Sequence, residues 1–181
     1  MPNSINRTGW LLFCLASTLL LLPSLLTWGI FVDGLTYASI SRNLMEGRGT
    51  FWMTSYTETV HREFFEQPPL VFFLQSWLFS IFGDHYLVEK LYSLALYGLA
   101  TWLISQSWRD LLPEASEFSW LPPFICLLVS KWAWGFKAGI LEPTVAVLVL
   151  SAFLAFLRSG IAMSTLLAVL LAGAAGLLVL L

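Results

Sequence analysis

The chain has 181 residues, of which 58% are hydrophobic and only 11% are charged, and its formal net charge at pH 7 is −2. Soluble domains are roughly 45–50% apolar and about 25% charged, so this composition excludes an ordinary soluble fold. The weak charge and the lack of any dense Lys/Arg cluster exclude nucleic acid as a partner, and they give no polybasic patch for a lipid surface.

Apolar runs of about 20 residues match the hydrocarbon core of a bilayer, in which a helix satisfies its own backbone hydrogen bonds. The sequence therefore predicts an all-α, polytopic transmembrane protein, with about five spans and interfacial helices in the first outer loop. We expect residues 1–181 to form a single transmembrane domain in contact with membrane lipids. The run 10–32 follows Arg7, is too long for a signal peptide and lacks a cleavage pattern, so we predict a first span with a cytoplasmic N-terminus.

The next segment, residues 33–68, is rich in charged residues and is the predicted outer loop. Apolar and polar positions recur with helical spacing up to Gly47, which predicts a short amphipathic helix lying on the membrane. Asp33 begins this loop directly after the first span. It could cap the helix, or it could act as a general base or position an acceptor hydroxyl.

The apolar run 69–82 decides the topology. At about 14 residues it suits an interfacial or re-entrant segment better than a full span. If it does not cross, the remaining predicted spans are 87–108, 118–134, 143–157 and the run from 161 onward.

This arrangement places Arg7, Arg109 and Arg158 together in the cytoplasm, and it places Glu142 on the same side as the acidic outer loop. If 69–82 crossed instead, Arg109 and Arg158 would lie outside, against the positive-inside tendency. We therefore expect acidic groups to converge at one membrane face.

Two further strings could carry chemistry. Glu66 and Gln67 precede two prolines, whose rigid backbone would hold a functional group in place, although a solvated turn also explains the pattern. Lys131, Lys137 and Glu142 flank a turn rich in Trp and Gly, where a lysine could snorkel to the interface or pair with a lipid phosphate. Glu142 could equally begin a helix. Motifs for nucleotide binding are absent.

Four short motifs lie in order along the chain: Asp33-Gly34-x-x-Tyr37, Asn43-Leu44-x-x-Gly47, Phe65-Glu66-Gln67-Pro68-Pro69-Leu70 and Leu78-Phe79-x-x-Phe82-Gly83. The pattern resembles the membrane-embedded C-type glycosyltransferases, in particular the protein O-mannosyltransferases and the aminoarabinose transferases of lipid A. The first outer loop of those enzymes reads Asp-Glu-x-x-Tyr and then Lys-Pro-Pro-Leu. Gly34 and Gln67 depart from that pattern, and Gln67 removes one candidate phosphate ligand.

The resemblance implies transfer of a sugar from a polyprenyl-phosphate carrier to a hydroxyl of a lipid, glycan or protein acceptor, at the outer face of the bacterial inner membrane. Asp33 would be the catalytic carboxylate, with Glu66 and Glu142 lining the same cavity, and Glu66 could help to hold a divalent metal. The substrate-binding residues carried over are Tyr37, Arg62, Gln67 and Lys137, of which the two cations would stabilise the departing phosphate.

Family members are much longer, so the resemblance covers their N-terminal part, and the end of the sequence at Leu181 inside an apolar run leads us to expect a piece of a longer protein. The alternative is a truncated, non-catalytic membrane subunit or scaffold that keeps the first helices of that fold. A transporter or channel is disfavoured, because the carboxylates lie at span edges and no repeat of broken helices is visible.

Overall fold

The computed structural model describes residues 4–27, 29–59 and 62–160, and the regular elements of that part are helical. Three helices are long and apolar enough to cross a membrane: α1 (Ser4–Leu26), α4 (Leu87–Leu111) and α7 (Glu142–Ser159). The shorter elements are α2 (Val32–Met45), α3 (Leu70–Phe82), the 3-10 helix η1 (Pro113–Phe118), α5 (Leu121–Leu128) and α6 (Ser130–Ala138). The all-helical class is therefore confirmed for the described residues, together with helices that are candidates for membrane spans.

The predicted continuous span over 118–134 is wrong. The segment consists of the end of η1, then α5, then α6, and the break falls at Val129, whose backbone is extended (φ −76°, ψ 112°). Within the described residues there are thus three candidate spans, fewer than the five predicted. The predicted span from residue 161 onward lies outside the described residues.

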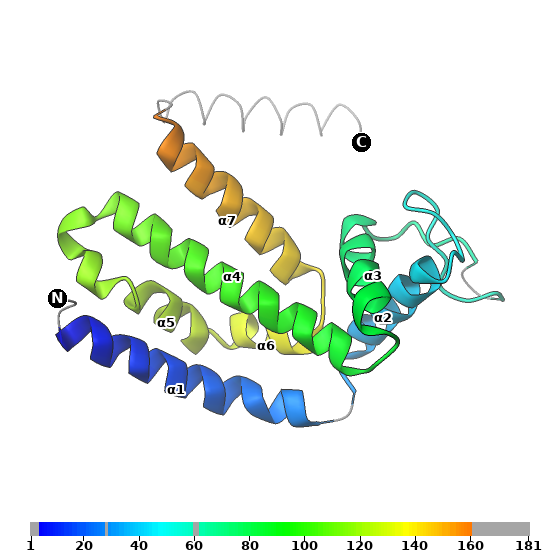
Figure 1. Cartoon of the computed structure of the whole chain (residues 1–181), viewed down its shortest axis with the longest axis horizontal. Helices are drawn as coiled ribbons and strands as arrows, with labels where there is room; N and C mark the ends of the chain where they lie inside the picture. The colour runs from blue at the N-terminus through cyan, green and yellow to red at the C-terminus, as the bar shows by residue number, and fades with distance from the viewer. Residues whose placement is uncertain (1–3, 28, 60–61, 161–181) are drawn as a thin grey trace.

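The two ends of the bundle can be identified from contacts between the long helices (Figure 1). At one end, the arginine end, Arg158 Nε donates to Asp110 Oδ2 at 2.7 Å, and Arg7 shares a hollow with Arg109. At the other end, the loop end, Lys90 Nζ donates to the carbonyl oxygen of Ser24 at 2.8 Å. Helix α1 is therefore antiparallel to α4, whereas α7 runs parallel to α4.

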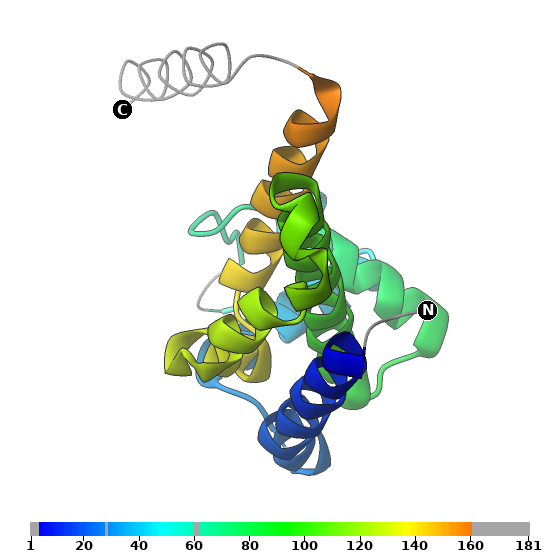
Figure 2. The ribbon, with the colours of Figure 1, turned by 90° about the vertical axis from the view of Figure 1, so that its left-hand side faces the viewer.

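The broken segment α5–α6 returns the chain from the arginine end to the loop end. Trp120, just before α5, packs against Gly9 of α1, where an added Cβ would lie 2.1 Å from the indole ring. Ala138, the last residue of α6, lies against Gly34 of α2. Figure 2 looks from the arginine end and shows α4 at the centre, with α1 below it and α5 and α6 to one side.

Helix α3 begins and ends at the loop end. Asp84, two residues after the end of α3, pairs with Arg42 of α2, and Arg42 also reaches Glu89 in the first turn of α4 at 3.4 Å. Buried Ser41 of α2 donates to Gln75 Oε1 of α3 at 3.0 Å. Helix α3 is shorter than the three candidate spans of the described residues, and whether it crosses a membrane stays a prediction.

A helix that ends before Gly47 is confirmed, whereas its predicted position on the membrane surface stays a prediction. Helix α2 ends at Met45, Gly47 has φ +77°, and Arg48 N donates to the carbonyl oxygen of Asn43 at 2.7 Å. The buried face of α2 packs into a small core at the loop end, which holds Tyr37, Ile40, Phe64, Phe72, Ala138 and Ile140. The helix is thereby fixed against α3 and α6, and its first turn is held next to the start of α7.

Candidate functional site

The largest hollow that gathers predicted site residues is a cleft of about 910 Å³, here called the Asp33 cleft. Its polar mouth at the loop end holds Asp33, Tyr37, Gln67 and Glu142. Its remaining wall is mainly apolar and is formed by Pro68, Ile104, Cys126, Trp132, Leu141, Val145, Ala146, Val149 and Leu150. Since eight residues of helix rise about 12 Å, the wall from Glu142 to Leu150 makes an elongated hollow that is polar at one end only.

Asp33 is the second residue of α2 and is exposed in the cleft mouth. The alternative that it caps this helix is wrong, because the N-cap residue is Phe31 and no side chain caps the helix. Within the described residues the Asp33 carboxylate has no hydrogen bond or ion pair. A negative charge is electrostatically favourable in the first turn of a helix. The Asp33 carboxylate is therefore stabilised at this position and is available to a ligand in the cleft.

Glu142 is the first residue of α7, and Pro143 follows it in the first turn. Proline is tolerated there because its missing N–H has no partner in a helix anyway. The Glu142 side chain is exposed and, like Asp33, has no partner within the described residues. Two carboxylates from the first turns of different helices thus reach one hollow, which agrees with the convergence expected from the topology.

Tyr37 lies one turn after Asp33 and is 8% exposed. Burial raises the pKa of the Tyr37 phenol above its ordinary value of 10, and the negative charges of Asp33, Glu142 and Glu66 raise it further. The phenol therefore stays protonated at neutral pH and can donate a hydrogen bond in the cleft mouth. The effect of Glu66 also shows that this carboxylate lies within electrostatic reach, although its side chain is not part of the lining.

Gln67 and Pro68 close the mouth from the segment that leads into α3. Pro69 occupies the N-cap position of that helix with φ −74°, so two successive prolines fix the backbone next to Gln67. The half-buried Gln67 amide brings both a donor and an acceptor to the cleft. The structure thus brings together four of the seven predicted site residues and leaves Glu66 at the edge.

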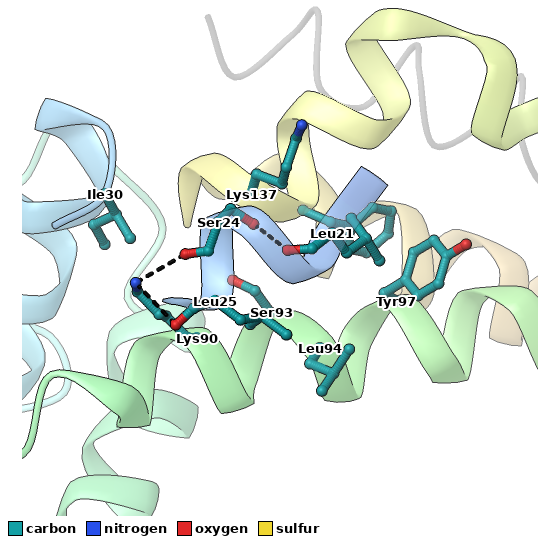
Figure 3. A pocket seen from close by; sticks show the side chains of 10 residues that line it. Leu21, Ser24, Leu25, Ile30, Lys90, Ser93, Leu94, Tyr97 and Lys137 are labelled. Carbon is teal, nitrogen blue, oxygen red and sulfur yellow. Dashed lines mark hydrogen bonds between the residues drawn. The ribbon is translucent and has the colours of Figure 1, made fainter. Parts of the chain in front are cut away.

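The two predicted cationic ligands lie elsewhere. Arg62 lines a separate hollow of about 710 Å³ within the outer loop, together with Arg48, Glu58 and Glu63. Lys137 lines a small pocket of about 20 Å³ between α1, α4 and α6, and its ammonium points away from that of Lys90 (Figure 3). This placement does not support the predictions that Arg62 and Lys137 bind a phosphate in the Asp33 cleft.

Lys131 is the cation next to the cleft. It lines a hollow of about 100 Å³ that shares Trp132, Glu142 and Ala146 with the Asp33 cleft. Lys131 and Lys137 are six residues apart on α6, so at 100° per residue their side chains leave the helix about 120° apart. Spacing alone does not distinguish the two lysines, because the choice depends on how α6 is rotated against its neighbours.

Gly34 lies where α2 comes close to the end of α6. A Cβ on Gly34 would lie 2.3 Å from the carbonyl oxygen of Ala138. Gly139 follows the last residue of α6 with φ +71° and lies on the other side of this contact. A Cβ added to Gly139 would be 3.6 Å from the Gly34 Cα. The close approach of α2 to the end of α6 therefore requires glycine at position 34, and it places Asp33 at the cleft.

The residues of the cleft do not fit a metal site. Within the described part of the chain, no group of three His, Cys, Asp or Glu side chains is arranged to hold a metal ion. Glu66, the predicted metal ligand, lies outside the lining, and the cleft offers only the carboxylates of Asp33 and Glu142. We therefore derive no chemical step from a metal.

Comparison with known proteins identifies no relative. No protein-family model, no curated protein and no solved structure matches the chain.

Proposed function

We propose that this protein transfers a sugar from a polyprenyl-phosphate carrier to an acceptor hydroxyl at the outer face of a membrane. One observation carries the proposal: Asp33 and Glu142 come together, without partners in the described structure, at the polar mouth of a long apolar cleft. A lipid-linked sugar has the same division, with a polar head on a long hydrocarbon chain. The short motifs around Asp33 and Gln67 support the same assignment.

In this proposal Asp33 acts as a general base. It accepts the proton of the acceptor hydroxyl while the hydroxyl oxygen forms a bond to C1 of the sugar. The bond between C1 and the phosphate oxygen breaks, and the polyprenyl phosphate leaves with the bonding electron pair. The isoprenoid chain lies along the apolar wall that includes Val145, Val149 and Leu150.

The other polar groups bind and orient the sugar phosphate. The protonated Tyr37 phenol and the Gln67 amide donate hydrogen bonds to sugar or phosphate oxygens. Lys131, next to Glu142, replaces Arg62 and Lys137 as the cation that balances the charge of the leaving phosphate. Glu142 accepts hydrogen bonds from sugar hydroxyls.

The arginine end supports the orientation. Arg7, Arg109 and Arg158 lie together there, opposite the Asp33 cleft. The positive-inside tendency puts this end in the cytoplasm, so the cleft opens at the outer face. We propose the inner membrane of a bacterium as the location.

The test is a transfer assay on the protein in its own membranes, with a polyprenyl phosphate that carries a radiolabelled sugar. Asp33→Asn keeps the size of the side chain but removes the base, so we expect transfer to fall by at least about 100-fold. The matched control is Glu63→Gln, which changes an exposed acidic residue of the outer loop outside the cleft. Equal transfer by Asp33→Asn and the wild-type protein would reject the role of Asp33.

A non-catalytic subunit that binds the carrier is the second candidate. It is favoured by the lining of the Asp33 cleft, in which neither Arg62 nor Lys137 takes part. This candidate predicts that the labelled carrier binds and that unlabelled carrier displaces it. It also predicts that no sugar is transferred from the bound carrier. If the wild-type protein bound the carrier without any transfer, and Ala146→Trp, which fills the cleft, abolished this binding, the cleft would be assigned to this function.

A further inference from the structure

A second hollow lies at the arginine end, on the opposite side of the molecule from the Asp33 cleft. Its volume is about 500 Å³, and we call it the arginine slot. It is formed by the first part of α1 and the end of α4, and its lining residues are Asn6, Arg7, Trp10, Leu11, Cys14 and Arg109. Two arginines that are far apart in the sequence thus meet in one hollow.

The charge of these two arginines is not neutralised within the slot. In the described part of the chain neither Arg7 nor Arg109 forms an ion pair, and no acidic side chain lines the slot. Asp110, the nearest acid in sequence to Arg109, is paired with Arg158 at 2.7 Å. The two exposed guanidinium groups are therefore available to an anion, and guanidinium groups match the geometry of a phosphate.

Apart from Asn6, the rest of the slot is mainly apolar and follows α1 away from the arginine end. Leu11 is 71% exposed, and Trp10 and Cys14 lie near it on the same helix. From Arg7 to Cys14 the helix rises about 10 Å, so the slot has a cationic mouth and an apolar wall. A free phosphate ion would use the mouth alone, whereas a phospholipid would use both.

We propose that the arginine slot binds one anionic phospholipid, with its phosphate between Arg7 and Arg109 and an acyl chain against Leu11 and Cys14. Basic hollows between membrane helices at the cytoplasmic side are suited to anionic headgroups. The bound lipid joins the beginning of α1 to the end of α4. This inference is independent of sugar transfer, because it concerns other residues at the other end of the bundle.

Binding can be measured by native mass spectrometry of the purified full chain in detergent, titrated with phosphatidylglycerol and with phosphatidylcholine. We expect one phosphatidylglycerol molecule to bind more tightly than phosphatidylcholine. Arg7→Gln and Arg109→Gln should each weaken its binding about fivefold, which corresponds to about 1 kcal/mol per cation near a lipid headgroup. Arg62→Gln is the matched control, since it removes one exposed cation that lies outside the slot and forms no ion pair in the described structure.

The two sources of phosphate are separated by protection of Cys14 from a maleimide reagent, in a Cys126→Ser background. Phosphatidylglycerol should slow labelling of Cys14, and glycerol 3-phosphate should not. Equal losses in Arg62→Gln and Arg7→Gln would show general surface attraction and would overturn the proposal. Protection by glycerol 3-phosphate, or no difference between the two phospholipids, would overturn it as well.

Discussion

Lys90 illustrates how a charged residue is used structurally at the boundary of the bundle. Its side chain is 5% exposed, yet it is not an isolated charge, because its ammonium donates to the carbonyl oxygens of Ser24 and Thr27 at the end of α1. The last carbonyls of a helix have no partner within that helix. Lys90 on α4 therefore closes the end of α1 and fixes the two antiparallel helices to each other.

Replacing Lys90 should destabilise the protein. In Lys90→Met the carbonyl groups lose their donor, and we expect the free energy of unfolding to fall by about 1–3 kcal/mol. The measurement is the thermal unfolding midpoint in a mild detergent. Lys137→Met is the matched control, because Lys137 lines the same small pocket but bonds no backbone carbonyl in the described structure. Equal midpoints for the two variants would contradict the capping role.

At the scale of elements, the contact between α2 and α6 decides where Asp33 lies. Gly34→Ala places a methyl group 2.3 Å from the Ala138 carbonyl oxygen, so α2 must move away from α6. We expect a loss of about 1–3 kcal/mol in stability, typical of overpacking, and a loss of sugar transfer. Both the unfolding midpoint and the transfer assay report on this change.

Gly98→Ala is the control for Gly34→Ala. Gly98 is also helical, and a Cβ there would meet nothing within 4 Å. Alanine is the better helix former by about 1 kcal/mol, so this variant should be as stable as the wild-type protein or more stable. If Gly34→Ala behaved like Gly98→Ala, the close contact would not determine the position of α2.

The long helices were predictable because their apolar runs are nearly continuous. The predicted run 87–108 became α4, and 143–157 became α7 with small shifts at the ends. The span over 118–134 failed because its break lies at Val129, in an apolar stretch without Gly or Pro at that point. Hydropathy measures how apolar a segment is, and it does not detect a change in backbone conformation.

At the site, the sequence predicted positions along the bundle better than side-chain directions. Asp33 and Glu142 were expected at one face because of the number of crossings, and they line one cleft. Arg62 and Lys137 were proposed from the resemblance, which does not say how this loop folds or how α6 is rotated. Gly34 was noted only as a departure, since its contact with Ala138 joins segments about a hundred residues apart.

At the scale of the whole molecule, two hollows lie at opposite ends of one helical bundle. The Asp33 cleft has a carboxylate mouth and the arginine slot has a cationic mouth, and both continue along apolar helix faces. The exposed leucines of α1, such as Leu15 and Leu19, give the bundle an apolar outer surface toward the membrane. In this account one end acts on a lipid-linked sugar, whereas the other end holds an anionic lipid.

The most direct test of the central claim is photolabelling with a polyprenyl-phosphate sugar that carries a diazirine in its isoprenoid chain. The account predicts that the label falls on residues 142–150 and near Trp132, and that unlabelled carrier competes with it. Ala146→Trp, which fills the cleft, should abolish this labelling, whereas Ala152→Trp on the exposed side of α7 should not. If the label were found only on the exposed leucines of α1 and unlabelled carrier did not compete with it, the probe would have reached the protein as an ordinary bilayer lipid does. That result would contradict the account.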